Sequence, residues 1–301
     1  EEEGWMDVFP DELIDLISTE EGIWSVPITI HRSNVMWYIP DNLDQWGVEV
    51  PNSWDEFLEI APELEEEGVT PLALGTNWTV NHLWESVALD VLGPNKWEAL
   101  WEGELAFDSE EGIAVWEKLD KIMEYVNEDY TSLSWQQATD LVVEGDAAFN
   151  VMGDWAAGYM DTTLELEPRE GFGWAASPGT EGEFMLLSDS FGLPKGAPHR
   201  ENTIAFLKLL GSKEGSDTFN PLKGSISPRL DSDLSKYSVY SQSAAEDFSS
   251  DRLVGSLAHG AVANEGFMNS FADVMEIFLD SRNPERAAAA AQAVAKQEGI
   301  Q

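Results

Sequence analysis

The chain has 301 residues, 43% of them hydrophobic, so it can bury a substantial core and form more than one domain. Its 57 Asp and Glu against 16 Lys and Arg give a formal net charge of −41, which argues against nucleic acid and anionic membrane surfaces as partners. The 13 Trp and 13 Phe argue against disorder, so we expect a folded protein whose acids form a solvated shell, as in halophilic proteins.

The first unusual segment along the chain is the extended run at 23–38, IWSVPITIHRSNVMWY, which is long for a single strand. A second extended run, FMLLSDSFGLP, follows much later at 184–194. Both place polar residues in the middle of an apolar stretch. A strand that crosses between two lobes has this pattern, because its centre lies at a cleft and not in a core.

Helix-capping signals predict the helix that follows the first extended run. Ser53-x-x-Glu56 is a capping box, and Gly68 is the expected end of this helix. Pro62 lies inside it and is expected to kink or shorten it. The apolar run at 71–75 then predicts a buried strand. The apolar face of the helix is expected to comprise Phe57, Leu58, Ile60, Ala61 and Leu64.

The middle of the chain continues the alternation of helices and strands. An amphipathic stripe predicts a helix through Ile113, Trp116, Leu119 and Met123. A further capping box, Ser134-x-x-Gln137, opens the helix that precedes the strand at 147–152.

Helices dominate the last third of the chain. Pro198 can begin a helix whose core is filled by 204–210 and which ends at Gly211. After Glu265 the chain is expected to be mainly helical. Because strands alternate with helices elsewhere, the predicted fold class is α/β.

The most informative stretch is EGDAAFNVMGDWAAGYM, at 144–160. The apolar strand stops at Gly153-Asp154, and Trp155 opens a helix of small residues, so an indole is fixed at a strand-to-helix corner. Open α/β sheets place ligand crevices at the carboxyl ends of strands. An indole with the Asp154 carboxylate beside it suits a polyhydroxylated ring, whose apolar face would pack on the indole while its hydroxyls meet the carboxylate. A plain packing role for Trp155 is the alternative.

Motifs for several other chemistries are absent from the sequence. It contains no dinucleotide-binding glycine motif, phosphate-binding loop, metalloprotease motif, calcium loop or nucleophile elbow. The absence of cysteine removes disulfides, thiolate metal sites and cysteine nucleophiles. The four histidines, His31, His82, His199 and His259, show no ligand-like spacing, so neither a metal site nor a cofactor is expected. Paired carboxylates of a glycoside hydrolase stay possible in so acidic a chain, but no pair stands out.

A set of positions elsewhere has the character of a neutral-sugar site, although each could also be structural. It combines two indoles, a hydrogen-bond acceptor, a cation and an imidazole. The cation is a lysine, a residue type that is rare in this chain. The set comprises Trp135, Trp155, Asp189, Lys223 and His259.

The order of these segments resembles that of the sugar-binding subunits of bacterial and archaeal ABC importers, in the class that includes maltose-binding protein. The likeness is greatest to the glucose/galactose-type binding proteins of that class, and it extends over essentially the whole chain. The segments that carry it are GIWSVPITIHRSNVMWYIP, VPNSWDEFLEIAPEL, TPLALGTNWTVNHLWE, LVVEGDAAFNVMGDWAAGY, DSFGLPKGAPHRENTIAFLKLLGSKEG and NPLKGSISPR.

The resemblance implies a two-lobed periplasmic-binding-protein-like fold of type II that closes on a sugar. One lobe would comprise 1–32 and 187–224, and the other 33–186 and 225–301, joined by crossing segments near 31–38 and 187–192. Family members begin with several strand–helix units before the point that matches the start of this sequence. The first lobe is therefore expected to be incomplete here, with an exposed sheet edge.

The resemblance also implies roles for individual residues. The tryptophans that match Trp135 and Trp155 face the sugar ring in such proteins, and the residues that match Asp189, Lys223 and His259 contact its hydroxyls. His31 matches a position at which maltose-binding protein presents a carboxylate to the sugar.

The function implied is capture of a glucose- or galactose-like monosaccharide outside the cell, without catalysis, and delivery to membrane ABC permease subunits. The full-length protein is expected to be monomeric and lipid-anchored at the cell surface. A glycoside hydrolase, and a sugar-sensing or glycan-binding module of the same fold, are the alternatives.

Overall fold

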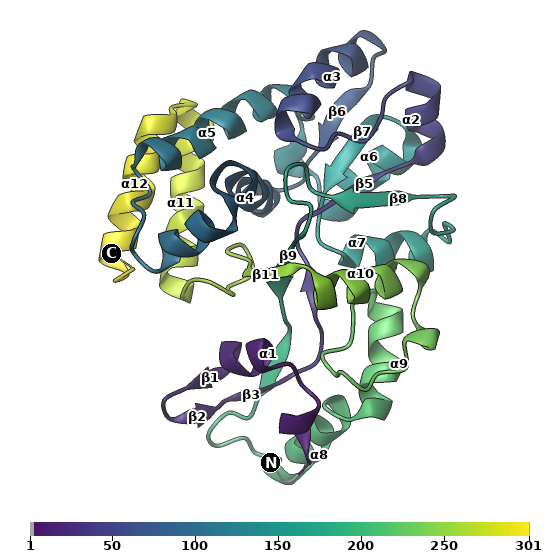
Figure 1. Cartoon of the computed structure of the whole chain (residues 1–301), viewed down its shortest axis with the longest axis vertical. Helices are drawn as coiled ribbons and strands as arrows, with labels where there is room; N and C mark the ends of the chain where they lie inside the picture. The colour runs from purple at the N-terminus through teal and green to yellow at the C-terminus, as the bar shows by residue number, and fades with distance from the viewer. Residues whose placement is uncertain (1–2, 301) are drawn as a thin grey trace.

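The computed structural model, which describes residues 3–300, has a mixed α/β fold (Figure 1). Strands and helices alternate through the first two thirds of the chain, as predicted, and helices dominate after residue 264. The α-helices of the described residues are α1 (Asp11–Leu16), α2 (Pro40–Trp46), α3 (Trp54–Glu66), α4 (Asn77–Trp101), α5 (Glu110–Ile122), α6 (Trp135–Glu144), α7 (Trp155–Gly158), α8 (Arg200–Leu210), α9 (Lys213–Lys223), α10 (Val239–Ser250), α11 (Glu265–Ser281) and α12 (Pro284–Gln297).

The largest sheet has four strands in the order β6-β7-β5-β8. Its strands are β6 (Thr70–Ala73), β7 (Ala147–Val151), β5 (Val35–Tyr38) and β8 (Gly173–Ala176). β6 and β7 are parallel, whereas β5 is antiparallel to both of its neighbours. The sheet lies with α2 and α3 at one end of the molecule, at the top of Figure 1.

Three smaller sheets lie in the middle and at the other end of the molecule (Figure 1). The order β11-β9-β4 joins β11 (Arg252–Gly255), β9 (Glu183–Leu187) and β4 (His31–Arg32). The remaining two are antiparallel ribbons, β10 (Ser190–Gly192) with β3 (Ser25–Pro27) and β1 (Ser18–Thr19) with β2 (Gly22–Ile23). α1, β1, β2, β3 and α8 lie at the bottom of Figure 1.

The two extended runs of the sequence cross from one sheet to another. Between residues 25 and 38 the chain contributes β3, β4 and β5 to three sheets in succession. The second run returns along the same path, because β9 pairs with β4 and β10 pairs with β3. His31 is thereby held opposite Leu187, two residues before Asp189.

The predicted caps form, with one difference in detail. Ser134 makes the complete reciprocal box with Gln137 at the start of α6. At α3 the Ser53 hydroxyl accepts from the Glu56 N–H at 3.1 Å, but the Glu56 carboxylate accepts from the Asn52 N–H at 2.7 Å instead of from Ser53. The helix continues through its internal proline to Glu66, so that proline does not shorten it to the preceding turn.

Aromatic rings form the centre of the largest core, between α4, α5 and α11. The Trp84 ring lies 4.8 Å from that of Phe271 and 5.5 Å from that of Trp116, measured between centroids. All three side chains are buried. The stripe predicted for α5 is confirmed, with Trp116 and Leu119 fully buried and Ile113 packed at the edge of this core.

The expectation that 204–210 fill a core is wrong. No residue of α8 is buried, and Phe206 and Leu209 are each 52% exposed. α8 also begins at Arg200, so Pro198 lies before the first turn and not in it. Within residues 3–300 no element covers the outer apolar face of α8, which is why a correct amphipathic pattern does not lead to burial.

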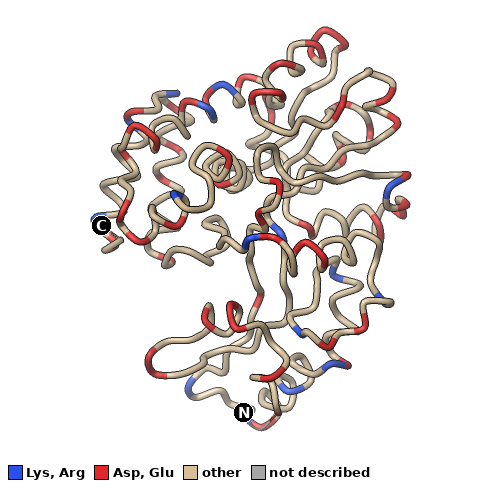
Figure 2. Tube along the Cα trace, in the orientation of Figure 1, with Lys and Arg blue, Asp and Glu red and all other residues tan. Residues whose placement is uncertain are grey.

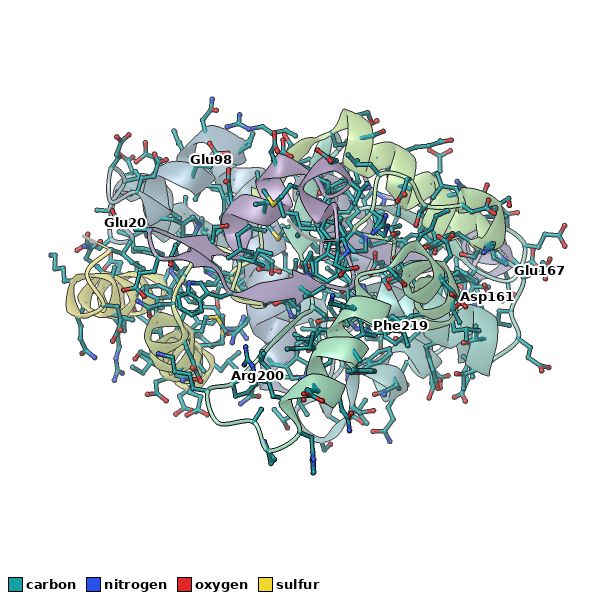
Figure 3. The ribbon with its side chains drawn as sticks, turned by 90° about the horizontal axis from the view of Figure 1, so that it is seen from below. Glu20, Glu98, Asp161, Glu167, Arg200 and Phe219 are labelled. Atoms are coloured by element: carbon teal, nitrogen blue, oxygen red, sulfur yellow. The ribbon has the colours of Figure 1, made fainter. Side chains whose placement is uncertain are left out.

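Acidic residues are spread along the chain over the whole molecule, whereas basic residues are sparse (Figure 2). The labelled acids Glu20 and Glu167 are exposed and extend toward the periphery (Figure 3). In the described part of the chain, no helix has both the length and the apolar character needed to cross a membrane.

Candidate functional site

The corner after β7 fixes Trp155, around which the candidate site is built. β7 ends at Val151, and α7 opens at Trp155, as the sequence predicts. The indole folds back over Gly153, so closely that a Cβ at position 153 would lie only 2.2 Å from the Trp155 ring. Glycine at 153 therefore leaves the space that this orientation of the indole requires.

Three imidazoles surround the Trp155 indole, although they are far apart in the sequence. The ring centroids of His31, His82 and His259 lie 5.6, 5.9 and 5.1 Å from that of Trp155, each in an edge-on arrangement. Trp78, in the first turn of α4, places a second indole 6.4 Å away and is 36% exposed. Histidines that look scattered along the chain thus meet at one aromatic cluster.

Asp154 does not play the part that the sequence suggests for it. The side chain is fully buried, and its carboxylate accepts hydrogen bonds from His31 Nδ1 and, at 2.9 Å, from the Arg32 N–H. The expectation that this carboxylate meets ligand hydroxyls is therefore wrong. Asp154 instead anchors the crossing strand β4 and orients His31.

His31 is a buried imidazole with one nitrogen satisfied and the other not. Its Nδ1 is bonded to Asp154, while Nε2 has no hydrogen-bond partner and lies 3.6 Å from Asp189 Oδ2. Burial works to lower the pKa of His31, but the charge and hydrogen bond of Asp154, together with the interaction with Asp189, outweigh it, and the pKa is raised. The imidazole thus holds Nε2 beside a carboxylate that solvent can reach.

Asp189 occupies the turn between β9 and β10, where two hydrogen bonds to the first crossing run fix its backbone. Its N–H donates to Thr29 Oγ1 at 3.0 Å, and its carbonyl accepts from the Ile28 N–H at 2.9 Å. The carboxylate is 49% exposed. Its interaction with His31 is the main cause that lowers the pKa of Asp189 to about 2, so it is ionised at neutral pH.

Lys223 ends α9 and contributes a positive charge that acts on both His31 and Asp189. Close backbone contact between α9 and α7 brings it there. A Cβ at Gly224 would lie 2.6 Å from the Gly158 Cα, and Gly224 has a φ of +80°, which favours glycine. Glycine at both positions therefore permits the approach that places this ammonium near the site.

Trp135 lies near the cluster around Trp155 but makes no ring contact with its members. It opens α6, as predicted, and its ring packs on Tyr159 at 5.6 Å. Trp135 and Trp155 both lie against the same buried apolar cluster. Of the six residues singled out from the sequence, the structure thus groups His31, Trp155, Asp189, Lys223 and His259, and leaves Trp135 beside them.

Sequence reasoning did not single out Trp78, His82 and Glu85, which lie on one face of α4. His82 and Glu85 are fully buried, and His82 contacts the His259 ring at 5.5 Å. Their spacing of four and then three residues, inside an otherwise apolar helix, is the signal that could have identified them.

An open depression lies next to the charged part of the site. It has a volume of 580 Å³, and Asp189 lies on its wall together with Ser188 and several apolar side chains. The apolar residues of this wall are Ile28, Phe191, Phe206, Leu210 and Phe219. A small polar molecule at Asp189 would thus have apolar surface on one side.

Comparison with known proteins gives matches over most of the chain. The sequence model of bacterial extracellular solute-binding proteins matches residues 2–217. An ABC transporter extracellular-binding protein of Pyrococcus horikoshii is 32% identical over 287 residues, which are 93% of this chain and 64% of that protein. The xylose/arabinose-binding protein XacG of Haloferax volcanii is 29% identical over 265 residues, 86% of this chain and 57% of that protein. The chain thus spans about two thirds or less of the length of these relatives.

Solved structures of solute-binding proteins share the fold of this chain. The solute receptor AcbH, described as exclusive for β-D-galactopyranose, superimposes with a TM-score of 0.85 at 17% sequence identity. The match covers 97% of this chain and 76% of that protein.

Proposed function

The chain belongs to the bacterial extracellular solute-binding protein family, and we propose that it captures a neutral sugar at Trp155. The observation that carries this proposal is the meeting of an indole with a half-exposed carboxylate, an ammonium and two imidazoles from distant segments. Indoles pack well against the C–H face of a sugar ring, and charged groups hydrogen-bond its hydroxyls.

The charges of the site favour a ligand without net charge. The Asp189 carboxylate and the Lys223 ammonium offset each other, and His31 is matched by the buried Asp154. A strongly charged ligand would find no excess of opposite charge here. This balance suits hydroxyl groups, which can both donate and accept hydrogen bonds.

We further propose a glucose- or galactose-like monosaccharide as the ligand. A hexose has about a dozen heavy atoms, and micromolar binding needs about −8 kcal/mol, or about −0.7 kcal/mol per atom. Such efficiency requires nearly every hydroxyl to be paired. Because a hydrogen bond to a charged group contributes about 1.5–3 kcal/mol, Asp189 and Lys223 are the proposed selectors of hydroxyl stereochemistry. The galactose preference described for AcbH is consistent with a ligand of this size.

The proposed biological role is delivery of the sugar to a membrane ABC permease, from a position outside the cell and anchored there by lipid. It is supported by the name of the Pyrococcus horikoshii relative, an ABC transporter extracellular-binding protein. The proposed lobes, 1–32 with 187–224 and 33–186 with 225–301, would close about 31–38 and 187–192 to bury the ligand. The glycosidase alternative is not favoured, because the matching family model and the relatives are solute-binding proteins.

Intrinsic tryptophan fluorescence tests the proposal. Titration with glucose or galactose is expected to shift the emission of the 301-residue chain, and Trp155→Ala is expected to abolish most of the shift. Trp24→Ala is the matched control, because Trp24 is 53% exposed and belongs to β2–β3 at the other end of the molecule. Absence of a response to any hexose, pentose or short oligosaccharide would refute sugar capture, and an undiminished response in Trp155→Ala would refute the site.

A further inference from the structure

Glu85 is a fully buried carboxylate without a basic partner among residues 3–300. It accepts hydrogen bonds from the Ser33 and Ser256 hydroxyls and, at 2.9 Å, from the Ala258 N–H. The ionisable groups that face it are imidazoles, with His82 Nδ1 at 3.6 Å from Oε1. Buried carboxylates are usually paired with a cation, coordinate a metal or take up a proton, and sugar binding does not account for the position of Glu85.

His82 presents a nitrogen lone pair to this carboxylate. Its Nε2 lies 2.8 Å from the Ser33 carbonyl, which can only accept, so the proton of the neutral ring is on Nε2. The remaining nitrogen, Nδ1, lies 3.3 Å from Nε2 of His259. A backbone carbonyl that fixes the tautomer in this way is typical of metal-binding histidines.

Two of the three separations among these side chains match those of a tetrahedral metal site. Bonds of about 2.1 Å to zinc place neighbouring ligand atoms about 3.4 Å apart in a tetrahedron. His82 Nδ1 lies 3.3 Å from His259 Nε2 and 3.6 Å from Glu85 Oε1, and all three atoms lie within 4.8 Å of one another. We propose that His82, Glu85 and His259 bind a divalent transition-metal ion of the zinc type.

The hydrogen bonds already made by Glu85 permit such an ion. The Ser256 hydroxyl lies 3.0 Å from Oε1 and 2.9 Å from Oε2, so it can bond Oε2 alone. Oε1 also accepts from the Ser33 hydroxyl, and its second lone pair can contact the metal. The ion would neutralise the buried carboxylate. Its fourth position would be left for water or a ligand hydroxyl, because the protein provides two nitrogens and one carboxylate oxygen at this point.

His259 gives the ion a route to the site and links it to the aromatic cluster. Unlike its two partners it is partly exposed, and its ring contacts both Trp155 and Trp78. A metal held by Nε2 leaves Nδ1 of the same imidazole available to a sugar hydroxyl. The metal is therefore expected to stiffen one wall of the proposed sugar site without being needed for its charge balance.

Isothermal titration with ZnCl₂, on protein first treated with EDTA, tests the inference. The buffer contains excess Mg²⁺ and KCl, because Mg²⁺ prefers oxygen ligands and will occupy the acidic surface. The expected result is one tight Zn²⁺ per chain. Affinity is expected to fall at least about tenfold in His259→Ala and in Glu85→Gln, as for losses at other metal sites. His199→Ala, which alters a histidine at the cap of α8, is the matched control and is expected to bind as the parent does.

A second measurement keeps the test decisive if Glu85→Gln does not fold. The chain has four histidines, so their imidazole resonances can be followed individually by NMR. Zn²⁺ is expected to shift those of His82 and His259 and to leave that of His199 in place. Zinc binding that survives His259→Ala, or that Mg²⁺ displaces completely, would overturn the inference and leave His259 as a simple hydrogen-bond donor to His82. A sugar titration in EDTA is independent of this result, so the two proposals can fail separately.

Discussion

Replacement of Asp154 by Asn tests how the crossing strand is held and how His31 is oriented. The carboxylate is fully buried and accepts from both His31 Nδ1 and the Arg32 N–H. An Asn oxygen can still accept from Arg32, but its NH₂ group would face the proton on His31 Nδ1. Breaking a buried charge pair by altering one partner costs about 3–5 kcal/mol, a large share of a total stability of about 5–15 kcal/mol.

The same substitution is expected to change the pH dependence of stability. Because Asp154 raises the pKa of His31 above 6.5, its contribution to stability is complete below pH 6.5 and is lost as pH rises through the folded-state pKa of His31. The difference between the parent and Asp154→Asn should thus be largest in mild acid and should shrink in alkali. Urea unfolding at a series of pH values measures it, and NMR titration should show a lower His31 pKa in the variant than in the parent, since the charge and hydrogen bond of Asp154 are then lost. A loss under about 1 kcal/mol that does not vary with pH would refute this account of the pair.

The remaining predictions concern the site and the surface. Gly153→Ala is expected to displace the Trp155 indole, because the new Cβ would lie 2.2 Å from its ring, and to reduce the fluorescence response to sugar; an unchanged response would contradict this packing. Asp189→Asn and Lys223→Met are each expected to weaken sugar binding by about 1.5–3 kcal/mol, measured by calorimetry, whereas losses under threefold would remove them from the proposed contacts. With a net charge of −41, stability to urea should rise as KCl is increased from low to molar concentration, and a fall would argue against a salt-adapted surface.

Features that depend on neighbouring residues could be read from the sequence. The Ser134–Gln137 cap, the strand before Gly153 and the stripe of α5 each involve partners within a few positions, so local pattern determines them. The α/β class follows from their order. The wider family likeness rests on the joint agreement of many such segments.

Features that depend on distant partners could not be read in this way. Glu85 accepts from Ser33 and Ser256, which are 52 and 171 positions away, and His31 pairs with Asp154 across 123 positions. Local pattern can mark Glu85 on a face of α4 and Asp154 at a strand corner, but it does not identify their distant partners. The α8 error has a related cause, because an apolar face shows that burial would be favourable but not whether a covering element exists.

The most direct test of the central claim is a crystal structure of the chain grown with the sugar that gives the strongest fluorescence response. The account predicts a single sugar ring packed on the Trp155 indole, with hydroxyls within hydrogen-bond distance of Asp189, Lys223 and His259. A sugar bound elsewhere, or the Trp155 ring in contact with protein on both faces while sugar is bound, would contradict it.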